Sequence, residues 1–246
     1  MTTKVKNGLI GFFDILGYSS FLENNEAVIA VDIITDLLRE IQTLKENAIK
    51  TFSIENTVYS EIVKRIEYLI ISDSIILSLV CKKREDEDNE YKDELKVFLL
   101  YSSFLMKKLF IKGLPLRGSI DYGEFVIVEN TFVGKPIINS YKAGNKINLA
   151  ACSILEPVGI DILKDLENDL YFKYNTPIRN GEEISTLLHF LIGEGEGDNY
   201  KLDKIKDFKQ FIMDSFVKHN KPLDKKVYQK IINTEMFLRF CKAITK

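Results

Sequence analysis

Hydrophobic positions along the first half of the chain follow two alternating periods, one of about two residues and one of about 3.6 residues. Short β-rich runs bounded by turn residues predict strands, and longer runs with apolar residues three or four apart predict amphipathic helices. In chain order the pattern predicts a strand over 8–14, a helix from Ala27 to Leu44, a hairpin over 65–81 around a polar SDS turn, a solvated loop over 82–94 leading into a helix over 92–112, and strands over 116–123 and 124–130.

This order of strand, helix, two strands, helix and strand is the split βαβ pattern of a ferredoxin-like sheet. The sequence therefore predicts an α+β fold. The pattern weakens in the middle of the chain, where it predicts a helix over 135–146 and strands at 148–155, 169–175 and 184–192.

A glycine-rich segment, GEGEGDNY at 193–200, marks the expected boundary of the sheet-forming part. It lacks the Lys-Ser/Thr ending of a phosphate-binding P-loop, so we interpret it as a linker. Two amphipathic helices are predicted after it, over 201–218 and 224–243. We expect one main domain over 1–192 and a helical C-terminal extension over 193–246 that packs on or beside it.

Composition and charge narrow the class of protein. The chain has 246 residues, 46% of them hydrophobic, and a formal net charge of −2. Basic residues spread along a near-neutral chain argue against a nucleic-acid partner, and no apolar run is long enough for a bilayer span or a signal sequence. Cys81, Cys152 and Cys241 are far apart, so neither a disulfide framework nor a zinc site is expected. We expect a cytoplasmic protein without a membrane or nucleic-acid partner.

Two acidic residues lie at the ends of predicted strands. Asp14 ends the first strand, and Asp73 lies in the hairpin turn. Neighbouring strands of a split βαβ sheet would bring both carboxylates to one edge, where they cannot both ionise cheaply unless a cation such as Mg²⁺ or Mn²⁺ neutralises them. A second interpretation stays open, in which Asp14 caps the next helix and Asp73 is an ordinary turn residue.

Three segments resemble, in order, the motifs of class III nucleotidyl cyclase domains: FFDILGYSSF at 12–21, ISDSIILSL at 71–79 and LRGSIDYGEFVI at 116–127. This likeness covers about residues 8–146. A closer resemblance is to bacterial anti-phage signalling proteins that make cyclic pyrimidine nucleotides, carried by DILGY, SDS, RGSIDYGE, GKPIINSY and, near the C-terminus, NTEMF. The resemblance implies a cyclase-type sheet, with 1–192 as the catalytic domain and a nucleoside triphosphate as substrate.

Carried onto this sequence, the resemblance assigns Asp14, Asp73 and the carbonyl of Ile15 to two Mg²⁺ or Mn²⁺ ions. It assigns the triphosphate to backbone N–H groups at the start of the next helix, where the helix dipole favours an anion. The residues that carry those N–H groups are Leu16, Gly17, Tyr18 and Ser19.

The sequence departs from the family at one catalytic pair. Adenylate cyclases carry an Asn and, four residues on, an Arg that stabilises developing charge. In one alignment these positions fall on Ile138 and Lys142, and in another on Asn148 and Cys152, so neither restores the pair. We favour the first alignment, which leaves Lys142 as one candidate cation and Arg117, on its predicted strand, as the better one.

The residue that often selects the base in cyclases, four before the second Asp, is Leu69, next to Tyr68. Neither the Lys typical of adenine recognition nor the Glu typical of guanine recognition is present. The resemblance therefore implies a homodimer with shared active sites that converts UTP to its 3′,5′-cyclic monophosphate and pyrophosphate by two-metal catalysis. The alternatives are a cytidylate or adenylate cyclase, a catalytically dead cyclase fold that binds a nucleotide or a partner, and a polymerase palm.

Overall fold

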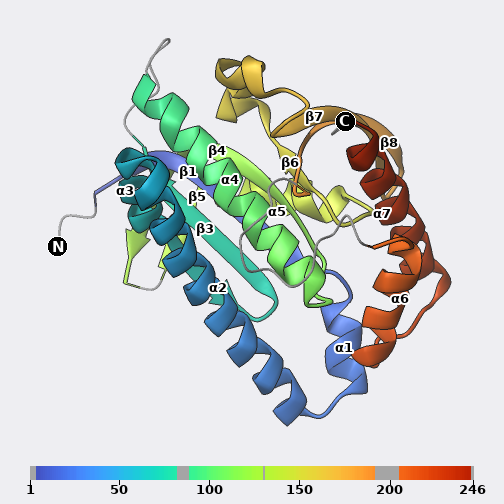
Figure 1. Ribbon diagram of the computed structural model, residues 1–246. Helices are drawn as coiled ribbons and strands as arrows, with labels where there is room; N and C mark the ends of the chain where they lie inside the picture. The colour runs from blue at the N-terminus through green and yellow to red at the C-terminus, as the bar shows by residue number, and fades with distance from the viewer. Residues whose placement is uncertain (1–3, 82–88, 130, 192–204, 245–246) are drawn as a thin grey trace.

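The computed structural model describes residues 4–81, 89–129, 131–191 and 205–244. One eight-stranded sheet runs through the molecule in the order β2-β3-β1-β4-β6-β8-β7, with β5 paired to β4 (Figure 1). Neighbouring strands are antiparallel except β4 and β6, which are parallel. The strands are β1 (Lys6–Ile15), β2 (Glu67–Ile71), β3 (Ser74–Val80), β4 (Leu116–Val128), β5 (Thr131–Gly134), β6 (Cys152–Ile154), β7 (Tyr171–Ile178) and β8 (Gly181–Leu188).

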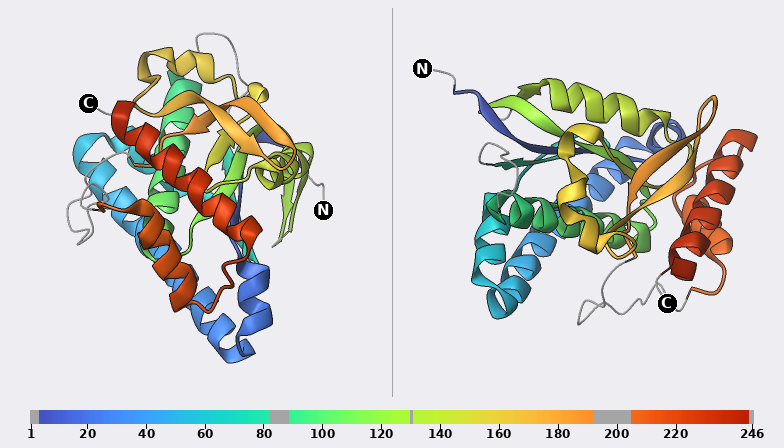
Figure 2. Two further views of the ribbon diagram at one scale, coloured as in Figure 1. Left: turned by 90° about the vertical axis from the view of Figure 1, so that its right-hand side faces the viewer. Right: turned by 90° about the horizontal axis from the view of Figure 1, so that it is seen from above.

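Helices cover both faces of the sheet, as the view from above in Figure 2 shows, with α5 on one side and α2 to α4 on the other. The helices are α1 (Tyr18–Asn24), α2 (Ala27–Glu55), α3 (Thr57–Arg65), α4 (Asn89–Ile111), α5 (Lys135–Lys146), α6 (Phe208–Lys218) and α7 (Lys225–Ile244), with 3₁₀ turns at Glu156–Val158 and Ile160–Leu166.

Alternation along β1 decides which side chains face which layer. Leu9 and Phe13 lie in the large buried cluster that also contains residues of α2, α3 and α4. Ile10 and Phe12 lie in a smaller cluster on the opposite face, where the Phe12 ring packs edge-on against Tyr141 of α5. By the same alternation, Asp14 belongs to the α5 face.

The C-terminal helices pack against the β7–β8 end of the sheet (Figures 1 and 2). Phe237 of α7 is fully buried, and its ring lies 5.7 Å from that of Phe172 and 5.3 Å from that of Tyr174. Buried residues of α6 and α7 belong to the same cluster as those of β1 and α4. Among the described residues, the extension therefore shares one continuous core with the sheet.

The expected α+β class is confirmed, and the strand-one, hairpin and 135–146 helix predictions match β1, β2–β3 and α5. In the hairpin turn, Ser72 has a φ of 56°, a left-handed conformation that glycine adopts at least cost. The predicted break at Gly123 is wrong, because β4 continues through it in unbroken register with β1 and pairs Gly123 with Gly8. The real turn follows at Glu129, with a φ of 51°.

Other boundaries also differ from the predictions. The first long helix continues beyond Leu44 and ends at Asn56, whose backbone is extended. The Asn56 side chain accepts a hydrogen bond from the Val58 N–H and so caps the start of α3. The pattern did not predict this helix. The strand predicted at 148–155 shrinks to β6. The loop predicted over 82–94 is helical from Asn89. Its first part, residues 82–88, lies outside the described residues, as do the predicted linker over 193–200 and residues 201–204 of the helix predicted after it.

Candidate functional site

Two carboxylates meet where β1 ends. Asp14 pairs across the sheet with Ser74, the first residue of β3, so the turn residue Asp73 lies beside it. The N–H of Ile15 donates a hydrogen bond to the Asp73 carbonyl at 3.2 Å, which ties the end of β1 to the turn. Burial raises the pKa of Asp14 to about 6, and a hydrogen bond with Asp73 adds to the rise. The structure thus brings together the two acids that the sequence placed on adjoining strands.

Arg117 of β4 completes this group from the other side. It pairs with Asp14 in the β1–β4 register, and its Nε and Nη2 atoms donate to Asp14 Oδ2 at 3.0 and 2.8 Å. The two side chains are 11% and 20% exposed, for Arg117 and Asp14, so this is a largely buried ion pair. Its attraction lowers the pKa of Asp14, but burial outweighs it.

A third partner, Asn145 of α5, was not predicted from the sequence. Arg117 Nη2 donates to Asn145 Oδ1 at 2.7 Å. Two glycines make this contact possible: a Cβ atom on Gly144 would lie 3.1 Å from the Gly118 backbone. The helix therefore approaches β4 closely at that point and places the next side chain beside Arg117.

The turn after β1 is held from two directions. The Leu16 N–H donates to the Pro115 carbonyl at 2.9 Å, so this N–H already has a partner in the protein. Gly17 has a φ of 78°, and a Cβ atom there would lie 3.0 Å from the Phe216 ring of α6. Tyr18 is buried and begins α1, a helix of seven residues that also contains Ser19.

The connection between α6 and α7 bonds to the chain on both sides of α1. Lys221 is 4% exposed, and its Nζ donates to the Leu16 carbonyl at 3.1 Å. Its ammonium also lies 4.9 Å from the centre of the Phe216 ring. At the end of α1, Asn25 Nδ2 donates to the His219 carbonyl at 3.1 Å. Burial lowers the pKa of Lys221 to about 8.

Helix α7 lies against the same edge through two polar contacts. Asn233 Nδ2 donates to the Asn148 carbonyl at 2.9 Å, and the Ala150 N–H donates to Thr234 Oγ1 at 2.9 Å. These two residues begin the NTEMF segment, and Phe237 ends it in the core. The segment therefore docks α7 on the chain that follows α5.

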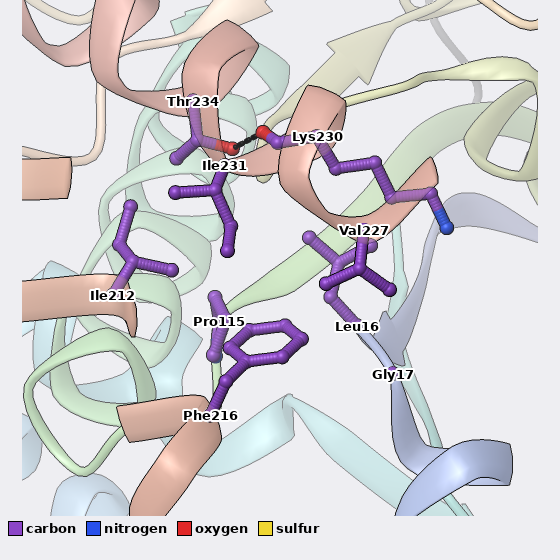
Figure 3. A pocket seen from close by; sticks show the side chains of 9 residues that line it. All are labelled: Leu16, Gly17, Pro115, Ile212, Phe216, Val227, Lys230, Ile231 and Thr234. Atoms are coloured by element: carbon purple, nitrogen blue, oxygen red, sulfur yellow. Dashed lines mark hydrogen bonds between the residues drawn. The ribbon is translucent and has the colours of Figure 1, made fainter. Parts of the chain in front are cut away.

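One turn before Thr234, Lys230 extends from α7 toward the end of β1, beside Leu16 and Gly17 (Figure 3). Burial lowers the pKa of Lys230, and the charges of Arg117 and Arg179 lower it further, whereas the charge of Asp14 raises it. The Lys230 ammonium is therefore within electrostatic range of Asp14 and Arg117. Sequence patterns gave no indication of this residue.

The remaining predicted residues are not all brought to the acid pair. Leu69 lies on the α5 face of β2, the face to which Asp14 belongs, in the smaller cluster with Phe12. Tyr68, its neighbour along the strand, faces the opposite side and packs on the larger cluster. Lys142 is exposed on α5.

The acid pair fits a divalent metal held jointly with substrate. Among residues 4–81, 89–129, 131–191 and 205–244, no group of three or more His, Cys, Asp or Glu is arranged so that it could hold a metal ion. Mg²⁺ needs no such cage, because one or two carboxylates and substrate phosphates suffice. The raised pKa of Asp14 indicates a carboxylate that would gain from an added cation, and both Arg117 contacts fall on Oδ2, which leaves Oδ1 outside them.

Comparison with solved structures identifies the architecture. The crystal structure of the adenylyl cyclase CyaB from P. aeruginosa matches with a TM-score of 0.50 at 12% identity, over 80% of this chain and 98% of that one. The fold is that of a cyclase domain. The guanylyl cyclase Cya2 has the same 12% identity and a TM-score of 0.44, over 81% of this chain and 98% of that one. No family model matches the sequence, and no curated protein does either.

The match with CyaB covers 80% of this chain, so one fifth of the chain lies outside it. No helix in the described part of the chain is long and apolar enough to cross a membrane.

Proposed function

We propose that the chain is a nucleotidyl cyclase. In the reaction the 3′-hydroxyl oxygen of a nucleoside triphosphate attacks its own α-phosphorus, the bond to the β-phosphate oxygen breaks, and pyrophosphate leaves with that electron pair. The 3′-hydroxyl proton passes to solvent, and the product is the 3′,5′-cyclic monophosphate. The observation that carries the proposal is the meeting of Asp14 and Asp73 at one edge of a cyclase-type sheet.

Asp14, Asp73 and the Ile15 carbonyl are the proposed ligands of two Mg²⁺ or Mn²⁺ ions. When bound, such ions lower the pKa of an attacking hydroxyl and neutralise phosphate charge. The chain's own part is to fix the two carboxylates, which it does through the β1–β3 pairing and the bond from the Ile15 N–H to the Asp73 carbonyl.

Arg117 and Asn145 are the proposed replacement for the family's Asn and Arg. They come from a strand and a helix rather than from one helix, and they contact each other at 2.7 Å. A guanidinium forms parallel hydrogen bonds to phosphate oxygens as readily as to a carboxylate. Arg117 is thus placed to stabilise charge that develops on the α-phosphate, with Asn145 fixing its orientation.

UTP is the proposed substrate, and the product would act as a signal in anti-phage defence, as the sequence resemblance implies. Leu69 supports a pyrimidine substrate. It occupies the base-selecting position in place of a Lys or a Glu, and it lies on the same face of the sheet as Asp14. Tyr68 drops out of the proposed base pocket, since it faces the other side of the sheet. Cytidylate and adenylate cyclase activities are the alternatives within the same reaction.

A homodimer with shared sites is proposed from the apolar surface of the α5 side. Ile71 of β2, which shares the face of Leu69, is 56% exposed, and two large apolar residues of α5 are exposed on the same side. An apolar surface of this kind suits a two-fold interface, where the same patch serves both subunits. These two residues are Ile138 and Tyr141.

A second candidate is a cyclase fold that binds a nucleotide without turnover. The Arg117–Asp14 ion pair favours it, because a cation already neutralises one of the metal acids. The two candidates differ in whether the bound nucleotide is cyclised.

Incubation with each of the four nucleoside triphosphates and Mn²⁺, with the products separated by mass, tests the proposal. We expect a cyclic monophosphate from the wild type and none from Asp73→Asn. Binding of a nucleotide without any cyclic product would favour the second candidate.

A further inference from the structure

The C-terminal extension aims one cationic side chain at the edge of the sheet that holds the acid pair. Asn233 and Thr234 fix α7 on the backbone of Asn148 and Ala150, and Lys230 lies one turn earlier on the same helix. In Figure 3 its side chain runs past Leu16 toward the strand that carries Asp14. Its direction is therefore set by the docking of the helix.

The extension is fastened to the turn after β1 as well. The buried Lys221 bonds the Leu16 carbonyl, and Phe216 packs on Gly17. Helix α6 and its connection to α7 thus hold the turn after β1 of the same subunit. A side chain of α7 has a fixed position relative to the end of β1, which is the condition for a binding residue.

Two arginines lie within electrostatic range of Lys230. Burial opposes the ionisation of Lys230, as do the charges of Arg117 and Arg179, whereas the charges of Asp14 and Asp224 favour it. Among the described residues, Lys230 forms no salt bridge that would compensate. Like charges held together in a partly buried place are stabilised when an anion binds between them.

The cavity behind Lys230 does not hold the anion. It is lined by apolar residues such as Ile212 and Phe216 and has a volume of about 10 Å³, enough for about one water molecule. An anion bound by Lys230 would therefore lie on its open side, toward Arg117 and Asp14.

We propose that Lys230 is a substrate-binding residue that contacts the polyphosphate of the nucleotide, supplied by the C-terminal extension of the same subunit that provides Asp14. This inference rests on the proposed function. It gives α7 a part in the site itself, and it gives the Asn233 and Thr234 contacts the task of aiming that helix.

Titration calorimetry with inorganic triphosphate tests the inference, because this probe has no base and undergoes no cyclisation. Lys230→Met keeps the aliphatic stem and removes the charge, and Lys230→Gln is the second variant if that protein folds poorly. Lys230→Arg restores a cation. Lys225→Met is the matched control, since Lys225 is exposed at the start of the same helix.

We expect the dissociation constant of Lys230→Met to rise about tenfold or more, as for the loss of a charged hydrogen bond, with Lys230→Arg within about threefold of the wild type and Lys225→Met unchanged. Wild-type affinity in both Lys230→Met and Lys230→Gln, with wild-type nucleotide turnover intact, would overturn the inference alone. A folded wild type that neither binds triphosphate nor cyclises any nucleotide would overturn the proposed function and this inference with it.

Discussion

Arg117 places two of its nitrogen atoms on one carboxylate oxygen of Asp14, across adjoining strands of the same subunit. The contact occupies Oδ2 and leaves Oδ1 outside it. Without bound metal, Arg117 supplies the positive charge that a buried carboxylate requires. The same arginine is near the place where we expect phosphate, so it can serve carboxylate and substrate in turn.

A double-mutant cycle measures this pair. Asp14→Asn, Arg117→Met and the double variant should show a favourable coupling of about 1–3 kcal/mol in the free energy of unfolding, because the pair is largely buried and each single change strands its partner. Urea denaturation of the four proteins provides the values. Strict additivity, within about 0.5 kcal/mol, would show that the pair contributes nothing to stability.

The raised pKa of Asp14 predicts a pH-dependent response to metal. An acid with a pKa near 6 in the folded protein and 3.8 in its ordinary state lowers stability as pH rises from about 4 to 6, since the unfolded chain gives up its proton first. Mn²⁺ binds the ionised form. We expect Mn²⁺ to raise the melting temperature at pH 7.5 and to have little effect at pH 5.

Two variants check the source of that response. Asp14→Asn should lose the Mn²⁺ effect at both pH values, and Asp36→Asn, which changes an exposed acid on α2, should retain it. A Mn²⁺ effect that persists in Asp14→Asn would place the metal elsewhere.

Mixed dimers test which residues act from which subunit. Arg117 bonds Asp14 of its own chain, so a mixture of Asp73→Asn and Arg117→Ala should stay inactive, because every site then lacks one of the two groups. If Leu69 faces the base from the partner subunit, a mixture of Asp73→Asn and Leu69→Arg regains intact sites. Random pairing would restore about one quarter of them.

The readout is cyclic nucleotide formed by each mixture relative to the separate proteins. Recovery in the Arg117 mixture would contradict the placement of Arg117 with its own Asp14. No recovery in the Leu69 mixture would remove Leu69 from the partner's site.

Lys221 predicts a second pH effect, in the alkaline range. Its pKa is about 8 in the folded protein and 10.5 in its ordinary state, so the unfolded chain binds more protons between these values and stability rises with pH there. Over the full window this amounts to about 3 kcal/mol. Lys221→Met should lack the rise, and denaturation at pH 8, 9 and 10 measures it. If the free energy of unfolding changes with pH equally in the two proteins, burial does not lower the pKa of Lys221.

Much of this architecture could be predicted from the sequence. The apolar run that ends at Asp14 and the SDS turn around Asp73 are local signals, and pairing of adjoining strands brings them together. The continuation of β4 through Gly123 could not be predicted, because glycine in a sequence indicates a turn. In the structure Gly123 pairs with Gly8 of β1 inside the sheet.

Contacts between distant elements left no local signal. Asn145 reaches Arg117 because Gly144 lets α5 approach Gly118, and that approach depends on the packing of helix on strand. Lys230 has the sequence context of an ordinary surface lysine, and its position follows from the docking of α7. Tyr68 and Leu69 were predicted together although neighbouring strand residues face opposite sides.

A competition assay tests the proposed cyclase activity: the protein is incubated with an equimolar mixture of ATP, GTP, CTP and UTP and with Mn²⁺, and cyclic products and pyrophosphate are quantified together. We expect cyclic UMP as the main product, with one pyrophosphate released for each cyclic nucleotide, and no product from Asp14→Asn. Cyclic AMP as the main product would overturn the choice of base. A folded wild-type protein that forms no cyclic nucleotide from any of the four would contradict the proposed cyclase activity.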